Sequence, residues 1–413
     1  MLVKPLIGPT RGKQNESNDR PTRFLPRLKF VILKLIMWGL SIFVSTLRRK
    51  HKHPDPQFTK EIVVFQFGGI GDMIIMTAAL RALSRRFQNA NISIVCSVFD
   101  HGKFLIKYRF VKELKTFNIY ALDSKGILNI DFWKQVCRMV KYLRSNTIDL
   151  LVNFHNPKLI DWFLIEFLVI ATSGAKYKMG PNPWFLDNQS IYDSWISESK
   201  LDGKHYKDFF LEIIEPLGIN PQNRETDFPI DSKDKTFAEN LLQRHHLKTE
   251  TLVCIHPSGS EPMRRWPQEK FRRVCERLGD KNVNVVLVGS KSDMTIGNFI
   301  SGNNLNAITL VGQTTLGQTA AVISKCSVFL GNDSGPFHLA VAVKTPAIGL
   351  IGGGAPTFHL YKRDDIKIMK QEVDCAPCRN IGCKKKECLE AITVDEVVKA
   401  VDEMIELNRR ENN

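Results

Sequence analysis

After about residue 57, short apolar runs typical of strands alternate along the chain with longer runs that have the apolar periodicity of helices. Short apolar runs predict strands at 61–67, 91–97, 149–154, 251–256, 284–289, 307–311, 326–331 and 347–351. Longer runs with helical periodicity predict helices at 72–87, 131–146, 157–172, 205–217, 233–246, 267–278, 316–325, 335–343 and 394–407. Apolar strands between helices are typical of parallel sheets with helices on both faces.

The alternation is interrupted once, by Leu217-Gly218-Ile219-Asn220-Pro221 and a polar stretch that runs to about residue 232. We therefore expect an α/β protein with two doubly wound, Rossmann-like parallel sheets that face each other across a cleft. Ligands of such sheets bind at the carboxyl ends of the strands. The last helix, 394–407, could pack back on the first of the two units.

The first 60 residues carry most of the formal charge of +15, with thirteen Lys and Arg against three Asp and Glu. The rest of the chain is close to balanced. The positive charge is therefore a terminal feature, which indicates an anionic partner at that end and not a nucleic-acid-binding fold.

Residues 30–47 form an apolar run within this basic end, and Arg27, Lys34, Ser41 and Arg48 recur on one narrow face of a helix through it. Such a helix with basic borders suits the headgroup region of an anionic membrane. A single membrane span and an ordinary packed helix stay open as alternatives. A cleaved signal peptide fits poorly, because the run starts late and ends in basic residues.

A second informative segment runs from Asn332 to Ala340, where an apolar strand ends in small residues and a proline before an apolar helix. Backbone N–H groups at such a helix start suit an anion, most often a phosphate or diphosphate. Asp333 would accept hydrogen bonds from sugar hydroxyls, and His338 can donate to a phosphate oxygen. A merely structural capped helix is the alternative.

The turn Gly68-Gly69-Ile70-Gly71-Asp72 follows the strand at 61–67. Its glycine spacing differs from the dinucleotide-binding fingerprint. It places the carboxylate of Asp72 at a helix start, beside a backbone at Gly69 and Gly71 that a substrate can approach closely. Asp72 could therefore act as a base, as a helix N-cap worth about 1 kcal/mol, or as both.

A third loop follows the strand at 251–256. Its small residues Ser258, Gly259 and Ser260 suit phosphate oxygens, and Arg264 and Arg265 come just before the next helix. A guanidinium can bind a diphosphate with two hydrogen bonds and stabilise the charge that builds on it. The next strand ends at Gly289, where a nucleoside can lie. A solvated basic pair at a helix start is the alternative for the arginines.

Together, Gly-Gly-Ile-Gly-Asp, Arg-Arg-Trp-Pro and Asp-Ser-Gly-Pro-Phe-His-Leu-Ala resemble the heptosyltransferase family of glycosyltransferases over about residues 60–410. The resemblance implies a GT-B fold, an ADP-heptose-like nucleotide-sugar donor and a lipid-linked lipopolysaccharide-core acceptor. It implies an acceptor-binding unit at 57–231 and a donor-binding unit at 232–413, and the basic extension at 1–56 lies outside the family pattern. It also implies the cytoplasmic face of the inner membrane as the location.

The same resemblance implies Asp72 as the general base on the acceptor hydroxyl, the Ser258 loop and Ser334–Gly335 as the diphosphate site, and Asp333 as a ligand of the donor sugar. Besides the basic extension, the chain departs from the family at two places. Arg264 stands where better-known members have a lysine, and Ser290 follows Gly289 where those members place a carboxylate toward the nucleoside.

An inverting displacement fits these residues, with a carboxylate that takes the acceptor proton and positive groups that stabilise the departing nucleoside diphosphate. The chain contains no Asp-x-Asp sequence, so we expect no metal cofactor in catalysis. A membrane-attached binding protein without catalysis is one alternative function. A nucleotide-dependent oxidoreductase is another, which the missing glycine fingerprint disfavours.

Four of the nine cysteines, Cys375, Cys378, Cys383 and Cys388, lie in one short basic stretch. Their spacing could hold a structural zinc ion, although the second pair is wider than in a usual zinc ribbon. Free or redox-active thiols and two disulfides are the alternatives, and a reducing cytoplasm disfavours the disulfides.

Overall fold

The structure, a computed structural model, describes residues 39, 53–118, 129–155, 160–182, 191–197, 204–302, 307–352, 361, 363–375, 383 and 385–412. The apolar run at 30–47 lies outside these ranges except for Gly39, so its helix stays a prediction. Within them, no helix combines the length and apolar content that crossing a bilayer requires.

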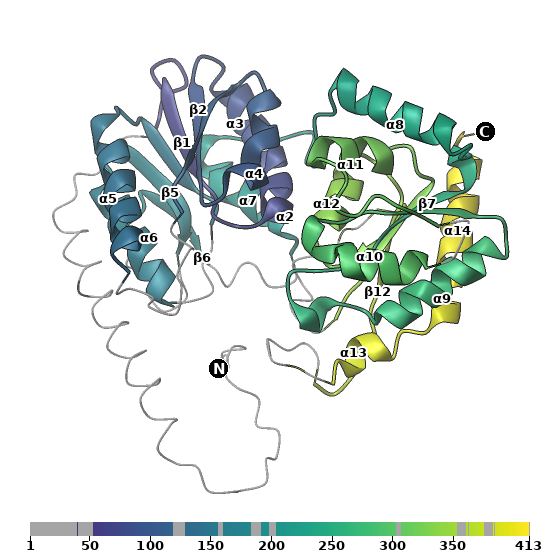
Figure 1. The fold of residues 1–413 in the computed structure, drawn as a ribbon. Coiled ribbons are helices and arrows are strands. Elements are labelled where there is room, and N and C mark those ends of the chain that lie inside the picture. The colour runs from purple at the N-terminus through teal and green to yellow at the C-terminus, as the bar shows by residue number, and fades with distance from the viewer. Residues whose placement is uncertain are drawn as a thin grey trace, which may run out of the picture.

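The first half of the chain forms a six-stranded parallel sheet in the order β3-β2-β1-β4-β5-β6, with helices on both faces (Figure 1). The strands are β1 (Glu61–Phe65), β2 (Asn91–Cys96), β3 (Val111–Thr116), β4 (Leu150–Asn153), β5 (Tyr177–Asn182) and β6 (Ser194–Ser197). The helices are α2 (Ile70–Ile75), α3 (Thr77–Arg86), α4 (Phe99–Gly102), α5 (Ile130–Ser145), α6 (Ile160–Thr172) and α7 (Tyr206–Ile214).

The second half repeats this architecture in the order β12-β11-β10-β7-β8-β9, again all parallel. Its strands are β7 (Leu252–His256), β8 (Asn284–Leu287), β9 (Ala307–Thr309), β10 (Val328–Asn332), β11 (Ala347–Leu350) and β12 (Ile366–Met369). Its helices are α8 (Ser232–Arg244), α9 (Gln268–Gly279), α10 (Met294–Ser301), α11 (Leu316–Ile323), α12 (Gly335–Ala342), α13 (Glu387–Glu390) and α14 (Val394–Asn412). The predicted pair of doubly wound sheets is confirmed.

The strand order of each sheet reverses direction once, and the candidate site lies at these two reversal points. The strand order reverses between β1 and β4 in the first sheet and between β7 and β10 in the second. The crevice outside the carboxyl ends of such neighbouring strands is where ligands bind in open α/β sheets. The predicted loops at Gly68–Asp72, Ser258–Ser260 and Asp333–Gly335 follow β1, β7 and β10, so all three lie at these points.

Several elements differ from the sequence-based expectation. The helix predicted at 72–87 begins at Ile70 and is broken at Met76 into α2 and α3. Strands β3, β5, β6 and β12 and helices α4, α10 and α13 were not predicted. The edge strand β3 was missed because its sequence Val-Lys-Glu-Leu-Lys-Thr buries only Val111 and Leu114 and has no continuous apolar run.

The last helix covers the second sheet. Its side chains Val397, Val401, Met404 and Ile405 are buried in one cluster with residues of β7, β8, β10 and α9. This packing gives no support to the expectation that the helix returns to the first unit. The boundary expected near residue 231 stays a prediction, and α8 begins directly after it.

The two units meet through α2 and α12, which lie side by side at the centre of the molecule in Figure 1. A Cβ added to Gly335 would lie 3.4 Å from the Cβ of Ile70, and one added to Gly71 would lie 2.7 Å from the Cδ2 of His338. Glycine at these positions lets the first turns of both helices approach closely. The amino ends of both helices therefore open into the same space.

Candidate active site

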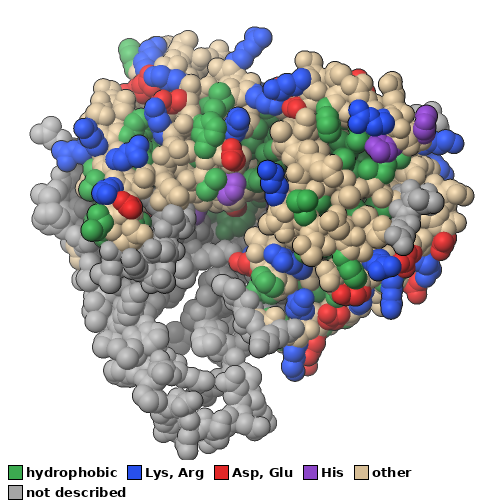
Figure 2. Space-filling model, in the orientation of Figure 1, with side chains coloured by type: hydrophobic (Ala, Val, Ile, Leu, Met, Phe, Trp, Pro, Cys, Tyr) green, Lys and Arg blue, Asp and Glu red, His purple; other side chains and the backbone are tan. Residues whose placement is uncertain are grey.

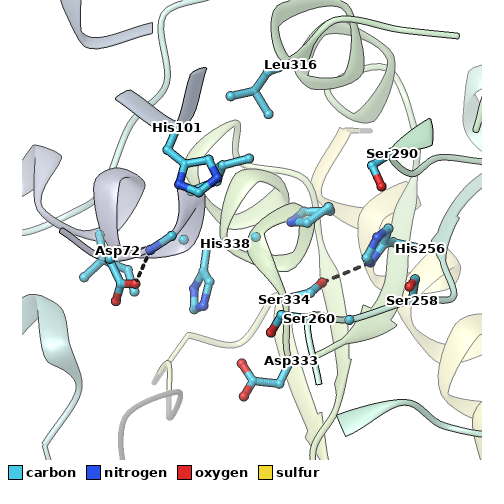
Figure 3. A pocket seen from close by; sticks show the side chains of 18 of the residues that line it. Asp72, His101, His256, Ser258, Ser260, Ser290, Leu316, Asp333, Ser334 and His338 are labelled. Carbon is cyan, nitrogen blue, oxygen red and sulfur yellow. Dashed lines mark hydrogen bonds between the residues drawn. The ribbon is translucent and has the colours of Figure 1, made fainter. Parts of the chain in front are cut away.

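A cavity of about 940 Å³ lies between the two sheets. Residues from both units line it, among them every residue of the predicted catalytic, donor-binding and acceptor-binding sets: Gly69, Gly71, Asp72, Ser258, Gly259, Ser260, Arg264, Arg265, Gly289, Asp333, Ser334, Gly335 and His338. Figure 3 shows Asp72 on one side and Ser258, Ser260, Asp333 and Ser334 on the other, with His338 between them in this view. The fold thus brings together residues that are more than 260 positions apart in the sequence.

Asp72 lies in the first turn of α2. Gly69 is the N-cap residue of this helix, and its backbone N–H donates a hydrogen bond to Oδ2 of Asp72 at 2.9 Å. The expectation that Asp72 could itself be the N-cap is therefore wrong, because the N-cap residue lies three positions earlier, at Gly69. A Cβ on Gly68 would lie 2.3 Å from the same Oδ2, so only glycine at position 68 accommodates the carboxylate in this place.

Asn332, the last residue of β10, ties the donor-side loops together. It is fully buried, and its Nδ2 donates to the carbonyl oxygens of Pro257 and Ser258, both at 3.1 Å. Its Oδ1 accepts a hydrogen bond from the backbone N–H of Trp266 at 2.9 Å. One amide side chain thus fixes the loop after β7 and the segment before α9. Sequence reasoning gave Asn332 no role.

Arg264 and Asp333, which the sequence assigned to different parts of the donor, form an ion pair. Nη1 of Arg264 lies 3.2 Å from Oδ2 of Asp333, and the two side chains are 16% and 6% exposed. Nε of Arg264 also lies 2.9 Å from a carboxylate oxygen of Glu261. Arg265 instead donates from Nε to the carbonyl oxygen of Gly259 at 2.7 Å. Arg265 therefore shapes the small-residue loop, and Arg264 brings positive charge beside Asp333.

His256, at the end of β7, is a second residue that sequence reasoning missed. Nδ1 of His256 lies 3.0 Å from the hydroxyl oxygen of Ser334, which in turn donates to the carbonyl oxygen of Asn332 at 3.1 Å (Figure 3). Burial lowers the pKa of His256 to about 4. The charge of Asp293 raises this pKa and the charge of Arg265 lowers it further, but burial is the largest effect. His256 is therefore neutral near pH 7, and it holds Ser334 at the start of α12.

His338 lies in the first turn of α12 and is 3% exposed. Its Nδ1 is 2.8 Å from the hydroxyl oxygen of Tyr361. The Tyr361 ring in turn lies 4.1 Å, centroid to centroid, from the ring of His205 in the first unit. Donation from His338 to a phosphate oxygen stays a prediction. The contacts show in addition that His338 belongs to a chain of rings that joins the units.

The carboxylate of Asp293 also lines the cavity, three positions after Ser290, where the sequence departs from the family pattern. Asp293 accepts hydrogen bonds from the backbone N–H of Ser290 at 2.9 Å and from its hydroxyl at 2.6 Å. Burial alone raises the pKa of Asp293, but the hydroxyls of Ser258 and Ser290 and the nearby His256 bring it below its ordinary value. A charged carboxylate therefore stands at this end of the cavity.

The first unit contributes a histidine and a glutamate that the sequence did not indicate. His155 follows β4 and lines the cavity, and its Nδ1 forms a short hydrogen bond with a carboxylate oxygen of Glu166 on α6, whose side chain is buried. The ring of His155 also packs edge-on against Phe67, at 5.6 Å between centroids. A signal existed in the sequence, since His155 directly follows a buried strand.

The cysteine cluster lies only partly within the described residues. Cys375 is exposed, Cys383 is half-buried and Cys388 is buried, whereas Cys378 lies outside the described ranges. Among the residues that are described, no group of three or more His, Cys, Asp or Glu has the arrangement of a metal site. The zinc expectation therefore stays untested.

A comparison with protein families identifies the family of this chain. Residues 136–389 match the model of glycosyltransferase family 9 (heptosyltransferase). The chain belongs to this family. It is therefore a glycosyltransferase, as the motifs at Asp72, Arg264 and Asp333 predicted, and the oxidoreductase and non-catalytic alternatives are set aside.

Individual proteins agree with this assignment. The chain is 26% identical to lipopolysaccharide heptosyltransferase 3 of Escherichia coli K12 over 81% of its own length and 95% of the relative. Its fold resembles that of a family 9 glycosyltransferase from Veillonella parvula, with a TM-score of 0.68, 20% identity and coverage of 86% of this chain and 99% of the other. It also resembles the E. coli heptosyltransferase WaaC solved with ADP-2-deoxy-2-fluoro heptose, with a TM-score of 0.61, 15% identity and coverage of 83% and 99%.

Proposed function

We propose that this family 9 glycosyltransferase transfers a heptose-like sugar from an ADP-linked donor to a lipopolysaccharide-core or related glycan. The observation that carries the proposal is the meeting of α2 and α12, which brings a carboxylate from one unit opposite a diphosphate-type site in the other. The named relatives support the choice of sugar and acceptor, since one is a lipopolysaccharide heptosyltransferase and another was solved with an ADP-heptose analogue.

On the donor side, the diphosphate would lie at the start of α12. The backbone N–H groups of Ser334 and Gly335 and the small-residue loop from Ser258 to Ser260 suit its oxygens, and the helix dipole favours its charge. Arg264 supplies the positive charge that stabilises the departing nucleoside diphosphate. Asp333, held by Arg264, is positioned to accept hydrogen bonds from the sugar hydroxyls. The adenosine would lie toward Gly289, with Asp293 near it.

On the acceptor side, Asp72 would remove the proton of the attacking hydroxyl. The Gly69 N–H fixes one oxygen of its carboxylate and favours the charged form, because hydrogen bonds to an ionised carboxylate stabilise it. Attack from the side opposite the diphosphate breaks the sugar–phosphate bond and inverts the anomeric centre. The proton goes to Asp72, and the electron pair of the broken bond leaves with the diphosphate.

A donor panel tests this proposal. Purified protein is mixed with ADP-heptose, ADP-glucose, UDP-glucose and GDP-mannose, and thermal unfolding and transfer to a heptose-deficient lipopolysaccharide core are measured. We expect the largest stabilisation and the only efficient transfer with ADP-heptose. The stabilisation is measurable, because a ligand at a hundredfold excess over its dissociation constant raises the free energy of unfolding by about 2.7 kcal/mol. Efficient transfer from a UDP or GDP sugar, with none from ADP-heptose, would reject the donor assignment.

The state of the four cysteines is a separate proposal. We keep zinc, thiols and disulfides as alternatives for Cys375, Cys378, Cys383 and Cys388, and assign none of them a part in the transfer reaction. Elemental analysis of the purified protein, together with thiol titration of the unfolded chain, separates the three. One equivalent of zinc, nine titratable thiols without metal, and only five titratable thiols are their respective results, because the chain has nine cysteines in all.

Membrane attachment through residues 1–52 completes the proposal, since a lipid-linked acceptor lies at a membrane surface. The basic residues of this segment would contribute on the order of 1 kcal/mol each near anionic lipid. Deleting it should release the protein into the soluble fraction, while transfer to a short soluble acceptor continues. Complete extraction of the full chain by salt alone would contradict an inserted helix, and resistance to alkaline carbonate would favour a true span.

A further inference from the structure

We propose that the outer face of α5 is a second membrane-docking surface, which binds anionic lipid and turns the acceptor side of the cavity toward the bilayer. The inference rests on the proposed action on a lipid-linked acceptor. It goes beyond residues 1–52, because it concerns how the folded unit is oriented once it reaches the membrane.

One side of α5 is buried and the other is both apolar and basic. Phe132, Val136, Met139 and Leu143 pack into the core of the first unit. The opposite side exposes Ile130, Trp133, Lys134, Cys137, Arg138, Lys141 and Arg144, which the helical repeat places on one continuous stripe that we call the α5 face. Figure 2 shows Lys and Arg side chains with hydrophobic ones among them on the left of the molecule, where Figure 1 places α5.

The apolar residues of the α5 face are at its start. Ile130 is 72% exposed and Trp133 is 44% exposed. Both stand beside the basic residues of the same face. Tryptophan is the side chain that most favours the boundary between lipid headgroups and acyl chains, where its ring is apolar and its N–H stays hydrated.

The charge of the α5 face is complementary to anionic lipid. Its charged residues are the basic Lys134, Arg138, Lys141 and Arg144, and the neighbouring Asp131, at the margin of this face, pairs with Lys134 at 2.8 Å. Within the described part of the chain, Arg138, Lys141 and Arg144 take part in no ion pair. Exposed basic residues beside exposed aromatic and aliphatic ones are the combination by which helices lie on membrane surfaces, which favours lipid over an acidic protein partner.

The position of the α5 face relative to the cavity gives the proposal its functional consequence. Phe132, in the first turn of α5, packs in the same cluster as Phe67, which follows β1. Because α5 connects the parallel strands β3 and β4, its first turn lies at the carboxyl ends of the strands, where Asp72 and His155 line the cavity. Insertion of Ile130 and Trp133 would bring this edge close to the lipid surface that carries the acceptor.

Alkylation of Cys137 tests the proposal in the full-length protein, because this thiol is exposed on the α5 face. The rate is measured by mass spectrometry with no vesicles, with phosphatidylcholine vesicles, and with vesicles that also contain phosphatidylglycerol. A cysteine introduced by Lys235→Cys on the exposed side of α8 serves as the matched control. We expect anionic vesicles to slow alkylation of Cys137 by about tenfold or more and to leave position 235 unchanged.

A pair of charge reversals provides the second control. Arg138→Glu with Lys141→Glu should abolish the protection of Cys137, while Lys233→Glu with Lys235→Glu, which changes the charge equally on α8, should leave it intact. Vesicle sedimentation of the same variants reports attachment through residues 1–52. Transfer to a soluble acceptor reports the proposed activity independently of both.

Unchanged Cys137 alkylation in protein that sediments with anionic vesicles would overturn the proposal, as would protein that does not sediment at all. Protection that depends on protein concentration and not on vesicles would assign the α5 face to a second copy of the chain. Protection without any heptosyl transfer from any donor would leave the docking surface standing and reject the proposed function.

Discussion

Gly71 lies directly against the ring of His338, so that a Cβ on this glycine would come within 2.7 Å of Cδ2 of the histidine. The first residue belongs to α2 of one unit and the second to α12 of the other. The His338 ring has little room to move, because it is buried and its Nδ1 is bonded to Tyr361. This contact sets how closely the predicted base and the predicted diphosphate site approach each other.

Gly71→Ala should therefore destabilise the protein. Alanine gains up to about 1 kcal/mol in a helix, but the overpacking against His338 costs about 1–3 kcal/mol. We expect a net loss in the free energy of unfolding, measured by denaturant titration, and weaker ADP binding. Gly174→Ala, at an exposed position outside a helix, is the control for an added Cβ that meets nothing within 4 Å. Equal stability of the two variants would show that the units do not meet as described.

His256 should make the stability of the unliganded protein depend on pH. Its pKa is lowered from 6.5 to about 4 by burial, so the folded protein disfavours its protonation. Stability should be full above about pH 6.5 and fall as the pH decreases toward 4. One pKa unit is about 1.4 kcal/mol, so the loss is on the order of 3 kcal/mol at most. His256→Asn, which can keep a hydrogen bond to Ser334, should flatten this part of the profile in urea titrations, and an unchanged profile would remove His256 as its cause.

The ion pair between Arg264 and Asp333 predicts opposite effects on nucleotide binding. Arg264→Ala should weaken ADP binding by about tenfold or more, because hydrogen bonds to charged groups contribute about 1.5–3 kcal/mol. Asp333→Ala should leave ADP affinity equal or slightly higher, because it removes a negative charge from beside Arg264. Asp333→Ala should, however, weaken the binding of an intact ADP-sugar, because the sugar hydroxyls lose their proposed acceptor. Calorimetry measures both, with the exposed Arg277→Ala as a control. A larger loss of ADP affinity for Asp333→Ala would reverse the assignment.

Transfer should continue in the presence of a chelator. The chain contains no Asp-x-Asp sequence, and the residues assigned to the leaving group are Arg264 and the start of α12. Activity in excess EDTA should therefore stay within about twofold of the untreated enzyme, because these groups replace the charge that a metal would supply. Activity that EDTA abolishes and Mg²⁺ or Mn²⁺ restores would contradict this.

The sequence predicted the parts of the fold that depend on local patterns. Apolar strands followed by glycine or serine turns, as at Gly68 and Ser258, identify both sheets and the strand ends that line the cavity. The edge strand β3 was missed because half of its side chains carry charge and interrupt the apolar run. The break at Met76 was missed because it interrupts no apolar period.

The sequence could not predict which side chains pair within the site. Arg264 and Asp333 are 69 positions apart, and Asn332 binds carbonyl oxygens 74 and 75 positions away. Such contacts depend on two loops being brought to neighbouring strands, which residue spacing does not encode. His155 and Glu166 are close in sequence, but their pairing depends on how α6 packs against β4.

Turnover by Asp72→Asn tests the central claim most directly. The asparagine can still accept the hydrogen bond from Gly69, so α2 and the donor site should stay intact, but the side chain can no longer take a proton. With ADP-heptose and a heptose-deficient core acceptor, we predict a fall in kcat of about a hundredfold or more, with ADP affinity by calorimetry within a few-fold of the unmodified protein. Turnover close to that of the unmodified protein would contradict the account and remove Asp72 from the mechanism.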